Sequence, residues 1–211
     1  MQKESFDRHQ HWENIYKSKQ LTEVGWYQPV PVTSLDFLTQ FKIPVTAKII
    51  DIGGGDSYFV DHLLTLGYQD ITVLDISETA IERAKNRLSN NAAKVKWIIA
   101  DAANFLPTEK YDFWHDRAAF HFLTKPIEVE KYVQAISIGI NAGGILILGT
   151  FSEKGPKTCS GIEIKQYSAS TMTNLLAPYF DKIKCIHVDH QTPSAMIQHY
   201  IFCSFRKSKA A

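Results

Sequence analysis

The stretch Ile49-Ile50-Asp51-Ile52-Gly53-Gly54-Gly55-Asp56-Ser57 decides the fold. Its β-branched, apolar first half is typical of a buried strand, and its three glycines predict a tight turn. The apolar residues that follow recur at helical spacing, and Gly67 closes that segment as a helix C-terminus requires. A strand, a glycine-rich turn and a helix form the first unit of a parallel α/β sheet, whose ligands bind at the carboxyl ends of the strands.

The rest of the chain alternates short β-branched runs with amphipathic stretches, which predicts a mostly parallel sheet with helices on both faces. Ser77 is expected to cap one helix and Ser170 to begin another. No helix-length connector separates the last two strands, so one of them is expected to run antiparallel at the sheet edge. The expected strands cover residues 47–52, 71–74, 95–100, 111–115, 145–150, 183–189 and 199–206.

Size and composition are those of one globular domain. The chain has 211 residues, of which 45% are hydrophobic and 21% charged. Its formal net charge of +1 argues against a nucleic-acid partner, which would require a local excess of Lys and Arg. Residues 1–16 are polar where a signal peptide would be apolar, and no apolar run is long enough to cross a bilayer. We therefore expect a cytoplasmic protein with no membrane partner.

The three cysteines are Cys159, Cys185 and Cys203. Their number is odd, and their spacing is not that of a zinc site or a disulfide framework. They indicate a reducing compartment. We expect Cys159 to be an exposed, inert thiol, with a place in a substrate channel as the alternative. His187 and His190 have no Cys or Glu partner nearby, so no metal site is expected.

Acidic residues stand at the expected ends of the second and third strands. Asp75 closes the second strand, where a carboxylate can accept both hydroxyl hydrogens of a ribose. Asp101 follows the third strand and can accept from an adenine amino group. Ile76 is placed to pack on the adenine face, and the small side chain of Ala102 leaves room for the base. The glycine-rich turn and Asp75 together predict a nucleoside site.

The turn itself distinguishes among nucleotide ligands. A dinucleotide loop would need a glycine where Tyr58 stands, because the tyrosine ring would obstruct the approach of the helix to a pyrophosphate. Asp51 and Asp56 place carboxylates around the turn, which is unfavourable beside a pyrophosphate but acceptable beside an ammonium and a sulfonium. The Gly-Lys-Ser/Thr of a P-loop is missing from this segment. S-adenosylmethionine therefore suits these residues better than NAD.

Asp51-x-Gly53-x-Gly55, Asp75, Asp101 and the block Tyr-Asp-Phe-Trp-His-Asp-Arg at 111–117 resemble class I S-adenosylmethionine-dependent methyltransferases in order and spacing. The resemblance covers nearly the whole chain. It is strongest to small bacterial methyltransferases with an aromatic Trp-Tyr-Gln segment, here at 26–28, and more distant to lysine methyltransferases that modify folded proteins such as citrate synthase.

The resemblance implies a Rossmann-like seven-stranded sheet of order 3-2-1-4-5-7-6 with the seventh strand antiparallel. It also implies a division of the chain into two parts of one domain. Residues 1–46 form a helical and aromatic cap, and residues 47–211 form the methyltransferase domain.

By the same resemblance, Asp51 and Gly53 lie near the methionine moiety of S-adenosyl-L-methionine, and Asp116 lies at the edge of the methyl-donor pocket. Asp75 binds the ribose and Asp101 the adenine. The product is S-adenosyl-L-homocysteine. The expected cofactor-binding residues are Asp51, Gly53, Gly54, Gly55, Ser57, Asp75, Ile76, Asp101, Ala102, Asp116, Trp26 and Tyr27.

The sequence leaves the catalytic residues open. Asp116 and His121 are candidates for proton transfer, but Asp116 can equally form a structural ion pair with Arg117, and His121 can be a packed helical residue. Methyl transfer from a sulfonium requires in-line approach and desolvation more than a dedicated base. Four aromatic residues of the cap can face the sulfonium or pack in the core: Trp12, Tyr16, Trp26 and Tyr27.

The methyl acceptor and the oligomeric state are also open. A small molecule is the first expectation for the acceptor, a protein lysine the second and nucleic acid the third. A catalytically silent nucleoside-binding module is a rival of another class, and an NAD-dependent oxidoreductase is a second rival. Binding of S-adenosylmethionine without turnover would indicate the first rival, and binding of NAD instead would indicate the second.

Overall fold

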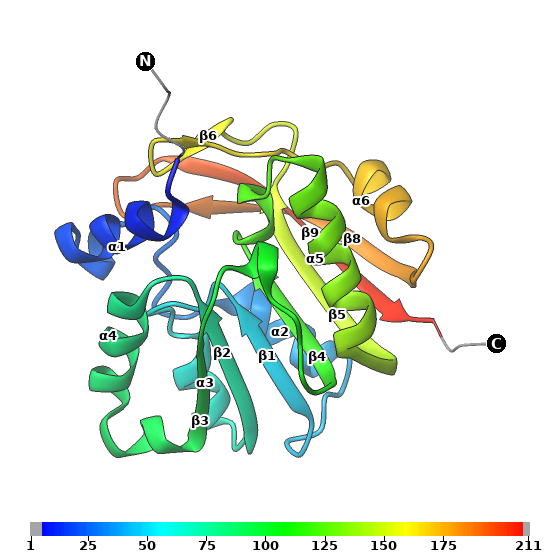
Figure 1. The fold of residues 1–211 in the computed structure, drawn as a ribbon, viewed down its shortest axis with the longest axis horizontal. Helices are drawn as coiled ribbons and strands as arrows, with labels where there is room; N and C mark the ends of the chain where they lie inside the picture. The colour runs from blue at the N-terminus through cyan, green and yellow to red at the C-terminus, as the bar shows by residue number, and fades with distance from the viewer. Residues whose placement is uncertain (1–5, 209–211) are drawn as a thin grey trace.

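The computed structural model describes residues 6–208. Seven strands form one sheet in the order β3-β2-β1-β4-β5-β9-β8 (Figure 1). Numbered among these seven strands alone, this is the expected order 3-2-1-4-5-7-6. The first five strands pair in parallel, and β9 pairs antiparallel with both β5 and β8. The predicted α/β sheet is confirmed, with its antiparallel strand one position in from the edge.

All seven expected strands are present. Their bounds are β1 (Lys48–Ile52), β2 (Asp70–Asp75), β3 (Val95–Ile99), β4 (Tyr111–Arg117), β5 (Ile140–Phe151), β8 (Phe180–Gln191) and β9 (Ile197–Lys207). The last three are longer than expected, because polar and glycine residues at their ends interrupt the apolar pattern. A separate short hairpin pairs β6 (Thr158–Cys159) with β7 (Ile162–Glu163).

The helices are α1 (Arg8–Ser18), α2 (Val32–Gln40), α3 (Phe59–Thr65), α4 (Glu78–Leu88), α5 (Pro126–Gly139) and α6 (Ala169–Leu176). Short 3₁₀ turns occur at η1 (Leu21–Glu23), η2 (Ser89–Lys94), η3 (Ala102–Asn104) and η4 (Phe120–Phe122). None of the helices described, from residue 6 to residue 208, has the length and apolar character needed to traverse a membrane.

Helix starts follow the capping residues. Ser77 caps α4 as expected, because its side chain accepts a hydrogen bond from the backbone of Ala80. The expectation that Ser170 begins a helix is wrong by two residues: Ser168 is the cap of α6 and forms a reciprocal capping box with Thr171. The sequence analysis did not anticipate α5, which begins at Pro126.

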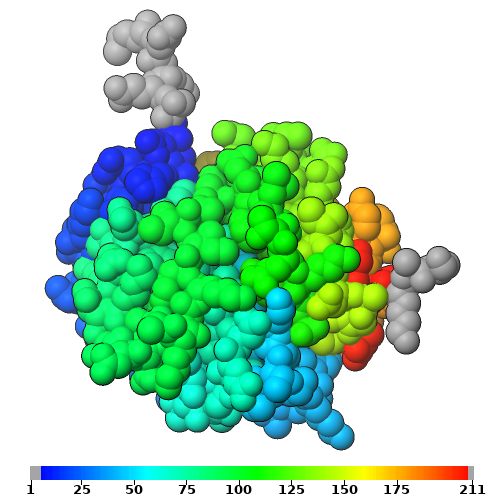
Figure 2. Space-filling view, turned by 60° about the horizontal axis from the view of Figure 1, so that its bottom comes forward, coloured from blue at the N-terminus to red at the C-terminus, as the bar shows by residue number. Residues whose placement is uncertain are grey.

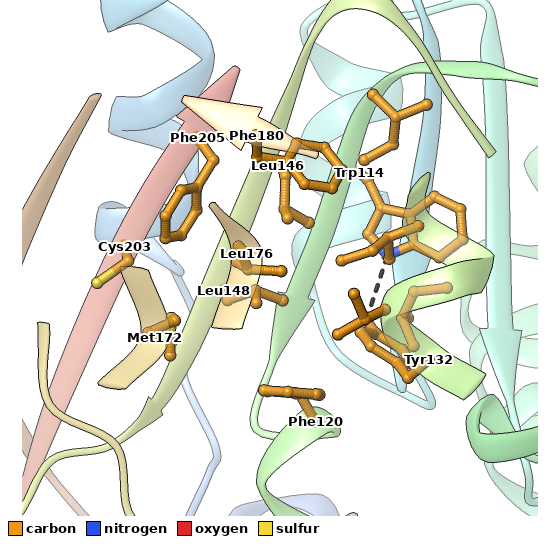
Figure 3. Packing of buried hydrophobic residues seen from close by; sticks show 14 of the residues in the cluster. Trp114, Phe120, Tyr132, Leu146, Leu148, Met172, Leu176, Phe180, Cys203 and Phe205 are labelled. Atoms are coloured by element: carbon orange, nitrogen blue, oxygen red, sulfur yellow. Dashed lines mark hydrogen bonds between the residues drawn. The ribbon is translucent and has the colours of Figure 1, made fainter. Parts of the chain in front are cut away.

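Helices cover both faces of the sheet (Figure 1). Apolar residues of α2, α3 and α4 pack on one face, and those of α5 and α6 pack on the other. Figure 3 shows the buried cluster on the face that α5 and α6 cover. There Trp114 of β4 donates a hydrogen bond to the Tyr132 hydroxyl at 3.2 Å. The two layers hold the strands in register and so fix the positions of the residues at the strand ends.

Two of the cysteines form a disulfide, which corrects the expectation that all three are free. Cys185 and Cys203 are direct partners in the register of β8 and β9, and their Cα atoms lie 4.1 Å apart. The sequence could not indicate this pairing because it depends on the hairpin register. The cysteines therefore no longer support a reducing compartment.

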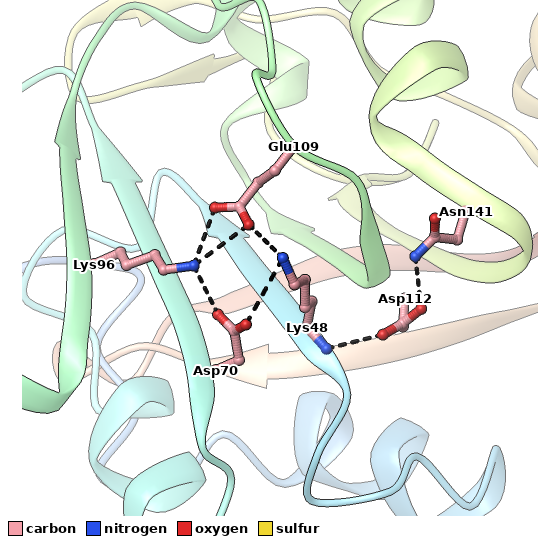
Figure 4. Close-up of polar contacts among 6 residues, drawn as sticks. All are labelled: Lys48, Asp70, Lys96, Glu109, Asp112 and Asn141. Atoms are coloured by element: carbon pink, nitrogen blue, oxygen red, sulfur yellow. Dashed lines mark hydrogen bonds and ion pairs between the residues drawn. The ribbon is translucent and has the colours of Figure 1, made fainter.

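The amino ends of the strands carry a network of charges (Figure 4). Lys48 contacts Glu109 at 2.7 Å, and Lys96 contacts Asp70 at 3.0 Å. Asp112 lies at this same rim, where it accepts a hydrogen bond from the backbone N–H of Lys48. These paired charges occupy the rim opposite the predicted ligand site.

Helix α1 is fastened to the start of α4 through one carboxylate. Glu13 is buried and accepts from the Ser77 hydroxyl at 2.7 Å, and from the backbone and hydroxyl of Thr79 at 3.0 and 2.6 Å. Burial alone would raise the pKa of Glu13, but the hydrogen bonds from Thr79, Ser77 and Lys17 lower it to about 2. Figure 2 shows the N-terminal segment in blue against the teal surface that includes α4.

We expect Glu13→Gln to reduce the free energy of unfolding by about 1–3 kcal/mol at pH 7, because an amide oxygen cannot replace both carboxylate oxygens as acceptors. Since the pKa of Glu13 is lower in the folded state, its contribution is complete above its ordinary pKa of 4.5 and declines as the pH falls toward about 2. Urea unfolding at pH 7 and pH 3 measures both effects. The exposed Glu130→Gln is the control, and an equal effect of the two substitutions would contradict the assignment.

Candidate functional site

A small cavity of about 90 Å³ lies over the carboxyl ends of the strands. Its walls come from the ends of β1, β2, β3 and β4, from α1, and from β9. Six of the expected cofactor-binding residues line it: Trp26, Gly53, Asp75, Ile76, Asp101 and Ala102. A smaller adjoining compartment is lined by Asp51, Gly53, Gly54 and Ser57, among others. The structure thus brings most of the expected residues to one rim.

The glycine-rich turn forms the floor between β1 and the cavity. Gly53 and Gly55 have φ angles of +66° and +46°, a conformation that L side chains rarely adopt. At Gly55 a β-carbon would lie 2.9 Å from Asp75 Oδ2 and 2.7 Å from the Tyr16 hydroxyl. A larger residue at either position would therefore distort the turn or close the space beside Asp75.

Asp75 ends β2 beneath the cavity and is almost completely buried. Its Oδ1 accepts from the backbone N–H of Ser77 at 2.8 Å, and no side chain within residues 6–208 donates to either oxygen. Burial raises the pKa of Asp75 to about 7, the backbone hydrogen bond of Ser77 opposes this, and the negative charges of Asp56 and Asp51 add to it. A buried carboxylate with unused acceptor capacity suits a ligand that supplies two hydroxyl groups.

Asp101 follows β3 and already has protein partners. It caps the turn η3 by accepting from Ala103, and Arg8 of α1 donates to both of its oxygens, at 3.0 and 2.8 Å. Arg8 also contacts Glu128 of α5 at 2.9 Å. Helix α1 is therefore tied across the cavity. Asp101 caps a turn in addition to lining the cavity, and its role in binding adenine stays a prediction.

Asp51 is held by a chain of buried side chains that reaches α2. His115 Nδ1 lies 2.6 Å from Asp51 Oδ1, and His115 Nε2 lies 2.9 Å from the Ser34 hydroxyl. Each of the three residues is at most 3% exposed. The sequence analysis did not identify His115 or Ser34, although the register that places His115 beside Asp51 follows from the parallel pairing of β1 and β4.

Aromatic rings of the N-terminal segment cover the cavity. The Trp12 ring meets Phe122 at 4.9 Å and Trp26 at 5.8 Å, and Tyr16 meets Trp26 at 6.2 Å, all centroid to centroid. All four residues line the cavity as well as packing on one another. These rings can present their faces to a cation in the cavity.

Three expected residues lie away from the cavity. Asp116 is fully buried and accepts from the Tyr132 hydroxyl at 2.6 Å and from the backbone of Ala119 and Phe120. His121 is fully buried, and burial lowers its pKa to about 3. Tyr27 packs against Tyr58 with ring centroids 6.2 Å apart. Ser57, at the smaller compartment, uses its hydroxyl to accept from Phe59 at the start of α3.

Asp116 does not form the ion pair with Arg117 that was left open as an alternative, because successive residues of a strand point to opposite faces. Arg117 faces the cavity and also lines the smaller compartment. Cys159 lines the cavity and is partly buried, which raises its pKa, so the expectation of an exposed thiol is wrong and its place is in the cavity wall.

Comparison with known proteins is consistent with this geometry. Residues 49–144 match a family described as a methyltransferase domain. A malonyl-[acyl-carrier protein] O-methyltransferase of Ilyobacter polytropus is 26% identical over 108 residues, which are 51% of this chain and 39% of that protein. A mouse EEF1A lysine methyltransferase 2 is 28% identical over 156 residues, 66% of this chain and 63% of that protein. The matched segments thus span less than two thirds of these relatives.

Solved structures share the fold over nearly the entire chain. The N-methyltransferase NodS of Bradyrhizobium japonicum, in complex with S-adenosyl-L-homocysteine, superposes with a TM-score of 0.71 at 16% identity, covering 96% of this chain and 100% of that one. A methyltransferase of Anabaena variabilis gives a TM-score of 0.75 at 16% identity and covers 98% of both chains. Residues 49–144 thus match a methyltransferase domain, and the glycine-rich turn and sheet order are those of the class I S-adenosylmethionine-dependent methyltransferase fold.

Proposed function

We propose that this protein binds S-adenosyl-L-methionine in the cavity over the carboxyl rim and transfers its methyl group to a small-molecule acceptor. The observation that carries the proposal is the convergence of Asp75, Asp101 and the bare backbone of Gly53 on one cavity. The sulfonium supplies a methyl carbon open to attack: the acceptor's electron pair forms the new bond, and the electrons of the broken S–C bond remain on sulfur.

Each part of the chain has a role in this proposal. Asp75 accepts from the ribose hydroxyls, and Asp101 accepts from the adenine amino group beside Ile76. Asp51, held in place by His115 at 2.6 Å, faces the methionine end of the donor from the smaller compartment. The rings of Trp12, Tyr16 and Trp26 exclude water from the reacting atoms. We assign no general base.

A protein lysine is the second candidate acceptor, because the relatives at 28% and 31% identity are EEF1A lysine methyltransferases.

Titration calorimetry with S-adenosylmethionine and S-adenosylhomocysteine, followed by turnover on both acceptor classes, tests the whole proposal. Turnover by the wild-type protein is the expected outcome. Binding without turnover on any acceptor would favour a silent module, and binding of NAD in place of the donor would reject the family function.

Asp75→Ala should weaken S-adenosylhomocysteine binding by about 10- to 100-fold, because the ribose hydroxyls lose a charged acceptor. Asp70→Ala is the matched control: Asp70 begins the same strand and pairs with Lys96 on the opposite rim. Calorimetric dissociation constants for the two variants decide the point, and unchanged affinity in Asp75→Ala would refute the role of Asp75.

Affinity for S-adenosylhomocysteine should rise by about 10-fold from pH 6 to pH 8. The sign follows from the pKa of about 7: below it Asp75 carries a proton that must leave before both oxygens can accept hydroxyl hydrogens, and above it the carboxylate is ready. Asp75→Asn removes this titration and should flatten the profile. A slope that persists in Asp75→Asn would assign the pH dependence to another group.

A further inference from the structure

Arg117 lines the cavity and forms no salt bridge with any acidic residue in the described part of the chain. Arg117 is the last residue of β4 and donates to the backbone carbonyl of Trp26 at 2.7 Å. No other hydrogen bond of its side chain occurs among residues 6–208, and no carboxylate there lies within salt-bridge distance of it. A guanidinium has five N–H donors, so most of the donors of Arg117 remain for a ligand in the cavity.

Arg117 lies on the side of the cavity away from the expected adenosine. Asp75 and Asp101 follow β2 and β3, whereas β4 lies on the other side of β1, toward β5 and β9. Tyr200 and Gln198 of β9 line the cavity on this side, together with Cys159. Burial raises the pKa of Tyr200, and the positive charge of Arg117 opposes that rise, which is consistent with the guanidinium lying close to Tyr200.

The carboxylates nearest to this side are already engaged. Asp51 is bound to His115 at 2.6 Å, and Asp116 is buried against Tyr132 in the opposite layer. An ammonium entering here would be repelled by Arg117 and the sulfonium, and the carboxylate that lines the smaller compartment with Arg117, that of Asp51, is already bound to His115. An anionic group would be attracted by both positive charges. The electrostatics therefore favour an acidic acceptor over a lysine side chain.

We propose that the methyl acceptor is a small organic anion whose carboxylate or phosphate group is bound by Arg117. This inference rests on the proposed methyl transfer and specifies its substrate class. The guanidinium binds the anionic group through paired N–H donors, and the hydroxyl of Tyr200 and the amide of Gln198 border the same space. The nucleophilic atom elsewhere in the acceptor forms the bond to the methyl carbon, the S–C electrons stay on sulfur, and any proton on the nucleophile passes to solvent.

The test compares probes of equal shape and different charge. Benzoate and benzamide are titrated calorimetrically into the protein saturated with S-adenosylhomocysteine, and phenyl phosphate and phenol form a second pair. We expect the wild-type protein to bind at least one anion about 10-fold or more tightly than its neutral partner. Arg117→Gln should abolish that preference, and Arg117→Lys should retain part of it because the charge remains without the planar fork.

Arg206→Gln is the matched control, because Arg206 also donates to one backbone carbonyl, that of Gly143, and lies on the opposite rim. This variant should keep the full preference for the anion. Equal binding of both pairs to the wild-type protein, absence of anion binding, or a preference that persists in Arg117→Gln would overturn the proposal.

A second experiment distinguishes binding of the acceptor by Arg117 from binding of the donor's own carboxylate by Arg117. Arg117→Gln should bind S-adenosylhomocysteine and its decarboxylated analogue with the same affinity ratio as the wild-type protein. If the variant loses affinity for S-adenosylhomocysteine alone, Arg117 binds the donor and the proposal fails. If the wild-type protein binds no S-adenosylhomocysteine, the proposed function fails, and the anion pairs measured on the unliganded protein still report on Arg117.

Discussion

The burial of Asp75 between the glycine-rich turn and α4 is the constraint on which the site depends. A buried carboxylate needs donors, and the protein supplies one at the Ser77 backbone and leaves the rest of the carboxylate open beside Gly55. The positive φ of Gly55 makes that opening possible, since any β-carbon there would lie against Asp75 Oδ2. The cavity is thus set by backbone conformation and charge burial together.

The carboxylates at the opposite rim, at the amino ends of the strands, have a structural role. Asp70 and Glu109 are paired with Lys96 and Lys48, so their acceptor capacity is used within the protein. Asp75 has no salt bridge to any cation among residues 6–208, and Asp101 takes its cation from α1, an element that also covers the cavity. The contrast between the two ends of the sheet distinguishes the binding rim from the stabilising rim.

The sequence predicted the strands and the cavity's carboxylates because both depend on local patterns: apolar runs, glycines and the residues at strand ends. The strand order followed from the resemblance to class I methyltransferases. It did not identify His115, Arg8 or Ser34 as part of the site, since each acts through a contact more than 60 positions away, such as the 93-residue separation between Arg8 and Asp101. The pairing of Cys185 with Cys203, only 18 positions apart, was missed because it depends on the register of the β8–β9 hairpin. Strand alternation could have separated Asp116 from Arg117, because neighbours on a strand cannot share a face.

The ion pairs that Arg8 forms with Asp101 and Glu128 make one attachment of α1 sensitive to the ionic environment. These side chains are 16–26% exposed, so dissolved salt weakens their attraction, while the buried rings of Trp12 and Tyr16 are indifferent to it. Ionic strength therefore weakens one of the two polar attachments of α1 and leaves the other, the buried hydrogen bonds of Glu13, in place.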